Sequence, residues 1–75
     1  MDSKGVDYMN IGEKIREARI KAGLSQKALA ELIGTKQSNI ARYEANGQCP
    51  TIQKLLEIAK ATKIKPSWFL KDIDY

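Results

Sequence analysis

One stretch of this 75-residue chain decides its fold: QKALAELIGTKQSNIARYE, residues 26–44. Apolar residues recur at helical spacing on both sides of Gly34, and glycine tolerates the left-handed backbone of a tight turn. Ser25 before the stretch and Thr35 after the glycine are residue types that cap helix N-termini. Ala30, four residues before Gly34, is small enough to let two helices cross closely. The stretch therefore predicts two short helices joined by one turn.

Three more helices are predicted around this pair. We expect Asn10 to begin a first helix that Gly23 ends, Thr51 to begin a fourth, and Pro66 to begin a short fifth. The predicted inward-facing residues, in chain order of the first four helices, are Ile11, Ile15, Ala18 and Ala22; Ala28, Leu29, Leu32 and Ile33; Ile40 and Tyr43; Ile52, Leu55, Leu56 and Ala59.

The domain organisation follows from this pattern. Residues 1–9 show no periodicity and are expected to form a flexible tail. Residues 10–72 are expected to form one compact all-α domain of five helices, with the central helix pair at about 25–45. The third helix is expected to reach about Ala45, where Asn46-Gly47 ends it because both residues tolerate a positive φ.

Composition argues against an enzyme. The chain has no histidine and a single cysteine, Cys49, so His-based nucleophile pairs, the usual zinc sites and an internal disulfide are missing. We expect no catalytic residues, no metal and no cofactor. There is no apolar run long enough for a membrane span and no signal-like N-terminus, so a cytoplasmic location in a prokaryotic cell or a phage-encoded origin is expected.

Charge favours a polyanionic partner. The net charge is +4, but residues 14–65 alone hold 11 Lys and Arg side chains and 4 Glu side chains, a local net charge of +7. A basic body of this size suits nucleic acid. The alternative is a solvated surface with an excess of lysine.

The third helix begins with hydrogen-bonding side chains: Lys36, Gln37, Ser38 and Asn39, followed by Arg42 one turn later. Gln and Asn can make two hydrogen bonds to adenine, and Arg can make two to guanine. A short helix with such a front end and an apolar back fits the major groove of DNA. The alternative interpretation is an ordinary solvated helix face.

The chain resembles the phage-repressor and Cro-like helix-turn-helix family, often called the XRE family, over residues 11–70. The motifs that carry the resemblance are LSQKALA (24–30), IGTKQSNI (33–40), YE (43–44), NG (46–47) with Pro50, LLEIA (55–59) and WFL (68–70). The resemblance implies a lambda-repressor-like domain of five helices that binds double-stranded DNA sequence-specifically, usually as a two-fold homodimer, and that regulates transcription.

The resemblance also implies roles for individual residues. The base-reading positions of the family match Lys36, Gln37, Ser38 and Arg42, with Asn39 as a neighbour that reaches a base or a phosphate.

Outside the third helix, the resemblance implies that Gln26 donates to a phosphate and braces that helix. It also implies that Arg19 pairs with Glu44 inside the domain and lies near a phosphate; the alternative is two unrelated surface charges.

Other contacts are suggested by position alone. Lys27 is either a further phosphate contact or a plain surface lysine, and Asn46 and Gln48 offer donors to phosphate from the loop after the third helix.

The C-terminal aromatic cluster has two interpretations. Trp68, Phe69 and Leu70 are typical of a core that seals one end of a small bundle. Alternatively Trp68 and Phe69 contribute to a dimer contact that Ile73 extends, because three successive bulky residues cannot all face inward on one short helix.

Two functions are therefore expected. The first is a DNA-binding transcriptional regulator, a repressor, that places the third helix in the major groove of a two-fold operator. The second is an antitoxin-type interaction module that neutralises a partner protein and autoregulates its operon. The helix-turn-helix domain takes up nearly all residues, so no separate ligand-sensing domain is expected.

Overall fold

The computed structural model describes residues 11–70, with the side chain of Leu70 left aside. Within this range the chain forms five helices, as the sequence predicted: α1 (Ile11–Lys21), α2 (Gln26–Ile33), α3 (Gln37–Glu44), α4 (Ile52–Thr62) and α5 (Pro66–Leu70). The predicted N-cap Asn10, the predicted tail 1–9 and the dimer candidate Ile73 lie outside the described residues. No helix in the described range has the length and apolar character needed to cross a membrane.

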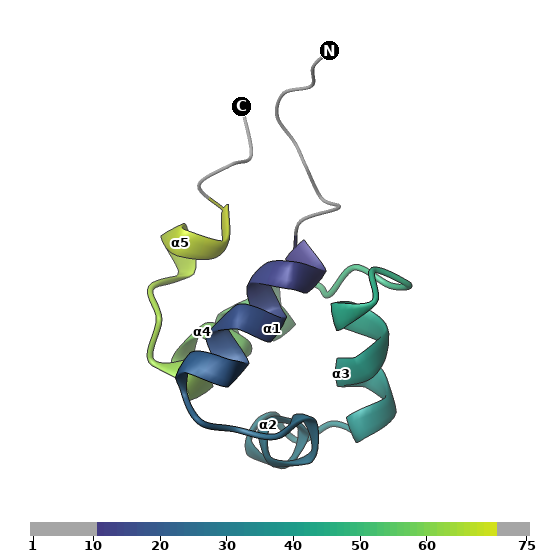
Figure 1. The fold of residues 1–75 in the computed structure, drawn as a ribbon. Coiled ribbons are helices and arrows are strands. Elements are labelled where there is room, and N and C mark those ends of the chain that lie inside the picture. The colour runs from purple at the N-terminus through teal and green to yellow at the C-terminus, as the bar shows by residue number, and fades with distance from the viewer. Residues whose placement is uncertain (1–10, 71–75) are drawn as a thin grey trace.

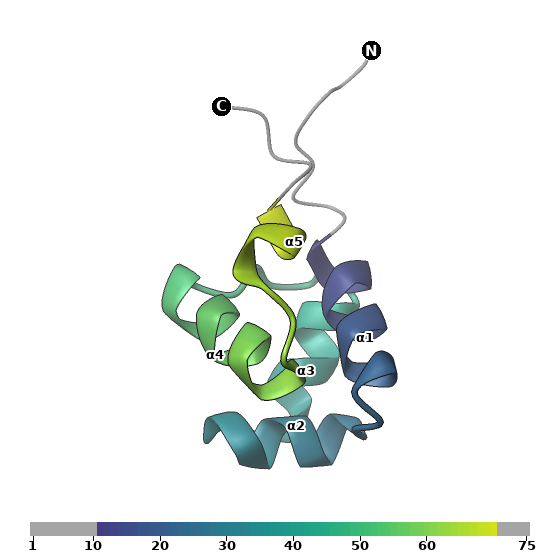
Figure 2. The same ribbon diagram turned by 90° about the vertical axis from the view of Figure 1, so that its left-hand side faces the viewer.

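The helices enclose one core between two ends of the molecule. In Figures 1 and 2, α2 lies across one end and α5 lies at the other, with α1, α3 and α4 between them. α1 packs against both α3 and α4, while α2 packs against the same two helices from below. The α2–α3 pair therefore lies at one edge of the bundle, and α3 keeps one side free of neighbouring helices.

The turn between α2 and α3 has the predicted geometry. The side chain of Ser25 accepts a hydrogen bond from the backbone N–H of Ala28 at 2.9 Å, which caps α2. Gly34 has φ 72° and ψ 35°, the left-handed conformation that favours glycine. The backbone N–H of Thr35 donates to the carbonyl of Ala30 at 2.8 Å, so the turn closes directly over a buried alanine.

The predicted start of α3 was wrong, whereas its predicted end at Asn46-Gly47 is confirmed. Lys36, not Thr35, occupies the N-cap position, because the hydroxyl of Thr35 instead accepts a hydrogen bond from the side chain of Asn39 at 2.7 Å. At the other end Asn46 has φ 62°, whereas Gly47 is not in the left-handed region. One left-handed residue is enough to end α3 and turn the chain away.

The core gathers side chains from all five helices. The largest fully buried side chains are Ile15, Leu29, Ile40, Ile58 and Phe69. Tyr43 is 5 % exposed and packs in the same cluster, so α3 is anchored from its inner side by Ile40 and Tyr43.

Some predicted inward-facing residues are in fact exposed. Leu32 is 61 % exposed and Ile52 is 63 % exposed, while Ala30 and Ile58 are buried instead. On α2 the buried residues are Leu29, Ala30 and Ile33, and Leu32 lies outside this stripe. On α4 the buried residues are Leu55, Ile58, Ala59 and Thr62. Ile52 precedes this stripe and Leu56 lies beside it, so both are exposed. Ala22 is also exposed, because it follows the last residue of α1.

The aromatic residues of α5 join the core. Phe69 is fully buried, which supports the core interpretation and contradicts its use as a dimer contact. Trp68 is half-buried and meets Phe69 edge-to-face, with ring centroids 5.1 Å apart. The ammonium groups of Lys14 and Lys21 lie 5.0 and 5.7 Å from the centre of the Trp68 ring, so α5 is held against α1.

Candidate nucleic-acid interface

A chain of polar side chains links α1, α2 and α3. The amide of Gln37 donates to Gln26 at 3.5 Å, and the amide of Gln26 donates to Glu44 at 3.1 Å. Arg19 completes the chain, because its Nε donates to Glu44 Oε2 at 2.6 Å and its Nη2 donates to Glu44 Oε1 at 3.1 Å. Nη1 of Arg19 donates to the carbonyl of Leu24. Gln26 therefore lies between the first turn of α3 and its last residue.

The ion pair between Arg19 and Glu44 is sheltered from solvent. Their side chains are 13 % and 5 % exposed, and the guanidinium meets the carboxylate with two donors. The hydrogen bond to Glu44 raises the pKa of Arg19, although burial acts in the opposite direction. Because desolvation offsets much of the attraction in such a pair, its main effect is to fix the orientation of α3 relative to α1.

The outer side of α3 presents the predicted reading residues. Lys36, Gln37, Ser38 and Arg42 are exposed, while Asn39 is half-buried. One amide N–H of Asn39 donates to the hydroxyl of Thr35, which leaves its second N–H and its side-chain oxygen for another partner. The structure therefore separates four freely exposed side chains from one that is partly tied to the α2–α3 turn.

Asn46 has a role that the sequence did not suggest. Its side-chain oxygen accepts a hydrogen bond from the backbone N–H of Gly12 at 3.0 Å, and so it satisfies an N–H of the first turn of α1. A Cβ at Gly12 would lie 2.5 Å from that oxygen and 2.7 Å from the carbonyl of Glu44. The available signal was a glycine in the first turn of a predicted helix, where most residues fit better.

The remaining predicted phosphate contacts are on the surface. Lys27 is exposed on the first turn of α2, and Gln48 is exposed in the loop after α3. The side-chain oxygen of Gln48 accepts a hydrogen bond from Nη1 of Arg42 at 3.4 Å. The structure therefore brings Gln48 to Arg42, a predicted reading residue, while Lys27 lies on a different helix.

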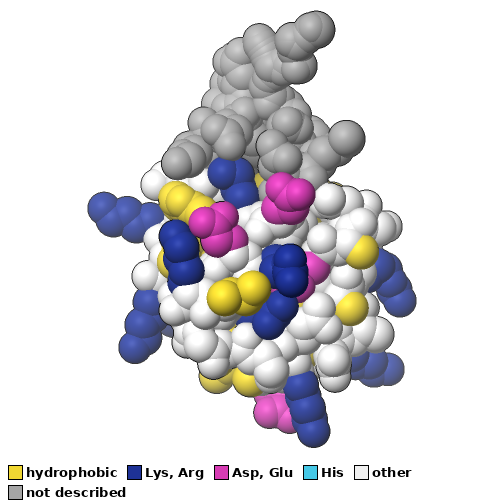
Figure 3. Space-filling model, viewed as in Figure 1, with side chains coloured by type: hydrophobic (Ala, Val, Ile, Leu, Met, Phe, Trp, Pro, Cys, Tyr) yellow, Lys and Arg dark blue, Asp and Glu magenta, His cyan; other side chains and the backbone are white. Residues whose placement is uncertain are grey.

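Charge alone does not locate the interface. On the face shown in Figure 3, Lys and Arg side chains spread around the outline, with acidic and apolar side chains between them. α1 contributes part of this mixture, since Glu17 and Lys21 form an ion pair at 3.5 Å. On this face the charges do not single out one helix, whereas the geometry of the α2–α3 pair points to α3.

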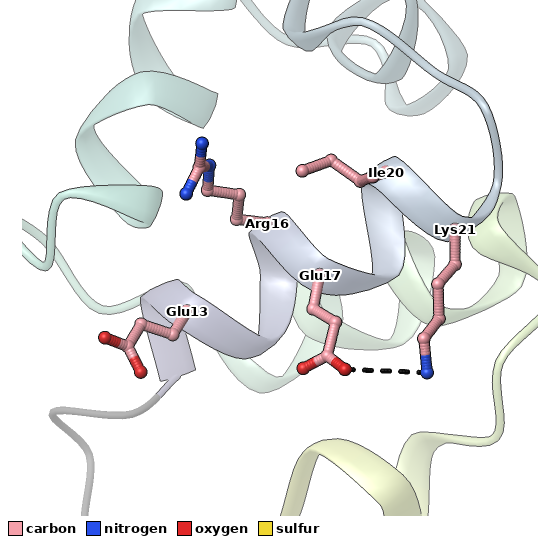
Figure 4. A pocket seen from close by; sticks show the side chains of 5 residues that line it. All are labelled: Glu13, Arg16, Glu17, Ile20 and Lys21. Carbon is pink, nitrogen blue, oxygen red and sulfur yellow. Dashed lines mark ion pairs between the residues drawn. The ribbon is translucent and has the colours of Figure 1, made fainter.

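A surface depression also lies on α1. It has a volume of about 450 Å³ and is lined by Glu13, Arg16, Glu17, Ile20 and Lys21. Figure 4 shows these side chains spreading from one helix, with Arg16 and Ile20 on one side and the pair Glu17–Lys21 on another. Among the described residues, no group of His, Cys, Asp and Glu side chains could hold a metal ion.

Two short helices crossing at a left-handed glycine, with the second exposing a polar face, define a helix-turn-helix protein of the lambda-repressor-like fold. The chain matches the helix-turn-helix family model HTH_3 over residues 15–69 and belongs to this family.

Similar proteins include transcriptional regulators and phage repressors. The chain is 31 % identical over 62 residues to the HTH-type transcriptional regulator ImmR of Bacillus subtilis, and the match covers 83 % of this chain and 49 % of ImmR. It is 33 % identical over 61 residues to repressor protein C2 of Salmonella phage P22, covering 81 % of this chain and 28 % of C2. The chain thus spans about half the length, or less, of these curated relatives.

Solved structures of similar fold include complexes with DNA. The P22 c2 repressor in complex with a synthetic operator is 32 % identical, with a TM-score of 0.74 over 83 % of this chain and 94 % of that one. The biofilm regulator SinR in complex with DNA is 31 % identical, with a TM-score of 0.75 over 80 % of this chain and 97 % of that one.

Proposed function

We propose that this protein is a sequence-specific DNA-binding transcriptional regulator that acts as a repressor. It places α3 in the major groove of each half of a two-fold operator. The observation that carries the proposal is that α3 has one buried side and one polar, solvent-exposed side. Ile40 and Tyr43 anchor its inner side in the core, while Gln37, Ser38 and Arg42 point to solvent. The relatives that are repressors or are bound to DNA support the same function.

The reading residues divide by chemistry. Gln37 suits adenine and Arg42 suits guanine, because each can make two hydrogen bonds to that base in the major groove. Lys36 and Ser38 extend the same exposed side. Asn39 contributes its side-chain oxygen and its second amide N–H, since only one N–H donates to Thr35.

Phosphate contacts surround this reading side. Gln26 and Lys27 lie on the first turn of α2, whose N-terminus favours an anion. Arg19 supports Gln26 through Glu44, and the loop after α3 contributes Asn46 and Gln48. These contacts position the protein on DNA without reading its sequence.

Selection from a random DNA library tests the proposal. We expect the protein to enrich an inverted repeat whose half-sites lie about one helical turn apart, as two-fold helix-turn-helix dimers require. Binding that is equal for all duplexes would overturn it. Sedimentation of the protein with the enriched duplex then tests whether two copies bind together.

A second candidate function is binding to a partner protein that it neutralises, in the manner of an antitoxin. A chain in the solved structure of the SinR–SinI complex is similar to this chain, with 30 % sequence identity and a TM-score of 0.76. The match covers 83 % of this chain and 61 % of that one. Here Leu32, Ile52 and Leu56 are exposed apolar side chains on α2 and α4. Affinity capture from the source cell distinguishes the functions, because a single stoichiometric protein partner favours this one.

A further inference from the structure

The loop between α3 and α4 is held in a defined position. The backbone N–H of Asn46 donates to the carbonyl of Tyr43 at 3.0 Å, and that of Gly47 donates to the carbonyl of Arg42 at 2.9 Å. The side chain of Asn46 also bonds to Gly12 at the start of α1. The loop is therefore fastened to the end of the exposed helix and to a second helix behind it.

This fastened loop lies against the side chain of Arg42. The oxygen of Gln48 is 3.4 Å from Nη1 of Arg42. Beside it, a Cβ at Gly47 would come within 3.2 Å of Cγ of Arg42 and within 3.6 Å of its carbonyl oxygen. Because Gly47 has no Cβ, the aliphatic part of the Arg42 side chain can pack along the loop.

We propose that Gln48 is a positioning residue, which holds the guanidinium of Arg42 in the orientation that reads a guanine. This inference rests on the proposed DNA-binding function and deepens it, because it assigns part of the sequence preference to the α3–α4 loop. An exposed arginine loses the freedom of several rotatable bonds when it binds a base. A partner that already holds the guanidinium plane reduces that loss. Since guanidinium has five N–H donors, the donors left over still match O6 and N7 of guanine.

A positioning residue and a phosphate contact affect different properties of binding: base preference in the first case and overall affinity in the second. Loss of a phosphate contact weakens binding to all sequences by the same factor. Loss of positioning weakens discrimination at the one base pair that Arg42 reads. The two roles of Gln48 are therefore separable in one experiment that measures both overall affinity and base preference.

The experiment is random-library selection, followed by titration of the enriched duplex and of duplexes changed at each base pair. Gln48→Ala is expected to lower the preference for guanine at one position by about fivefold or more, the low end of what an arginine contact discriminates. Preferences at other positions stay as in the wild type. Gln48→Glu keeps an acceptor at the same reach, so it retains that preference although its charge weakens binding to all duplexes.

Two control variants test whether the effect is specific to Gln48 and acts through Arg42, and a spectroscopic check tests folding. Gln53→Ala removes an exposed glutamine from α4 and is expected to leave both affinity and preference unchanged. In an Arg42→Ala background, adding Gln48→Ala is expected to change no base preference further, because the residue acts through the arginine. Circular dichroism checks that each variant keeps the helical content of the wild type.

The outcomes that overturn the inference are specific. A uniform loss of affinity in Gln48→Ala, with the guanine preference intact, would leave Gln48 with its phosphate contact alone and overturn the positioning role. A further change of preference in the Arg42→Ala background would show that Gln48 reads DNA itself. If the wild type enriches no sequence, the proposed function fails and this inference fails with it. If the wild type enriches a sequence, the proposed function stands, and the Gln48 variants alone decide whether Gln48 positions Arg42.

Discussion

At Gly12, the absence of a Cβ decides how closely α1 approaches the end of α3. A Cβ there would lie 2.5 Å from the side-chain oxygen of Asn46 and 2.7 Å from the carbonyl of Glu44, and closer still to the carbonyl of Tyr43. Two of these atoms belong to the backbone and cannot rotate away. By contrast, Gly34 has open space around it and needs glycine only for its φ of 72°.

We expect Gly12→Ala to lower the free energy of unfolding by about 3 kcal/mol, because it overpacks a helix contact and displaces the Asn46 cap. Gly34→Ala is the matched comparison and should cost about 1 kcal/mol from backbone conformation alone. Urea denaturation measures both. A Gly12→Ala variant as stable as the wild type would mean that α1 and α3 separate more easily than their contacts suggest.

Glu44 gives a second prediction at the same scale. Glu44→Ala leaves the guanidinium of Arg19 sheltered without its carboxylate, so we expect a loss of about 2–3 kcal/mol in stability. Glu17→Ala breaks the exposed ion pair with Lys21 and should change stability by less than about 0.5 kcal/mol. Thermal unfolding of the two variants compares them directly. Equal melting temperatures would show that solvent screens both pairs alike.

The pH dependence of this ion pair follows from the direction of the shift. Because the pKa of Arg19 is raised in the folded protein, the pair's contribution is complete below the unfolded-state value. The part of this contribution that is linked to the protonation of Arg19 is lost as the pH rises through the raised pKa. The arginine therefore stays charged throughout the neutral range in which DNA binding is measured.

At the scale of the element, α3 separates stability from recognition. Its inner residues Ile40 and Tyr43 are buried, while the exposed side chains of Gln37 and Arg42 bond to the side-chain amides of Gln26 and Gln48. Changes on the two sides of this one helix should therefore affect different measurements.

We expect the double variant Gln37→Ala with Arg42→Ala to lose its sequence preference while its stability changes by less than about 0.5 kcal/mol, as is usual for surface positions. Ile40→Ala should instead cost about 2–5 kcal/mol, because it leaves a cavity in the core. Library selection and urea denaturation are run on both proteins. A large loss of helicity in the double variant would contradict the exposed orientation of α3.

At the scale of the whole molecule, a basic body carries a proposed reading surface that the charges on the face in Figure 3 do not mark. Residues 14–65 carry a net charge of +7, yet the cations are spread around the face in Figure 3. Binding to DNA should therefore depend on salt through a limited set of phosphate contacts near α2 and α3.

We expect the affinity for the enriched duplex to fall by about 10³-fold or more between about 50 and 200 mM salt, if six or more phosphates are contacted. Lys27→Ala, on the first turn of α2, should reduce the slope of log affinity against log salt by about one for each copy bound. Lys65→Ala, next to α5 at the opposite end of the molecule, should leave the slope unchanged. An affinity that does not respond to salt would exclude a phosphate-dominated interface.

The sequence alone determined the features that depend on a few neighbouring residues. Ser25 and Thr51 cap their helices through hydrogen bonds to the N–H three residues on, and Gly34 adopts the left-handed conformation that its missing Cβ permits. Such features follow from local backbone chemistry, so the number and order of the helices could be predicted. The ion pair of Arg19 and Glu44 was predicted only through family resemblance, because 25 residues separate its members.

Tertiary structure decided which side of each helix is buried and which polar groups meet. Leu32 and Ile52 are apolar at helical spacing, yet they are exposed because the crossing of α2 and the length of the α4 contact leave them outside. Asn46 meets Gly12 because α1 packs against the end of α3, which brings together residues 34 apart in the chain. This pairing depends on the packing of whole elements, and no spacing along the chain encodes it. The contact between Gln48 and Arg42, six residues apart, is more local and depends on how the chain turns after α3.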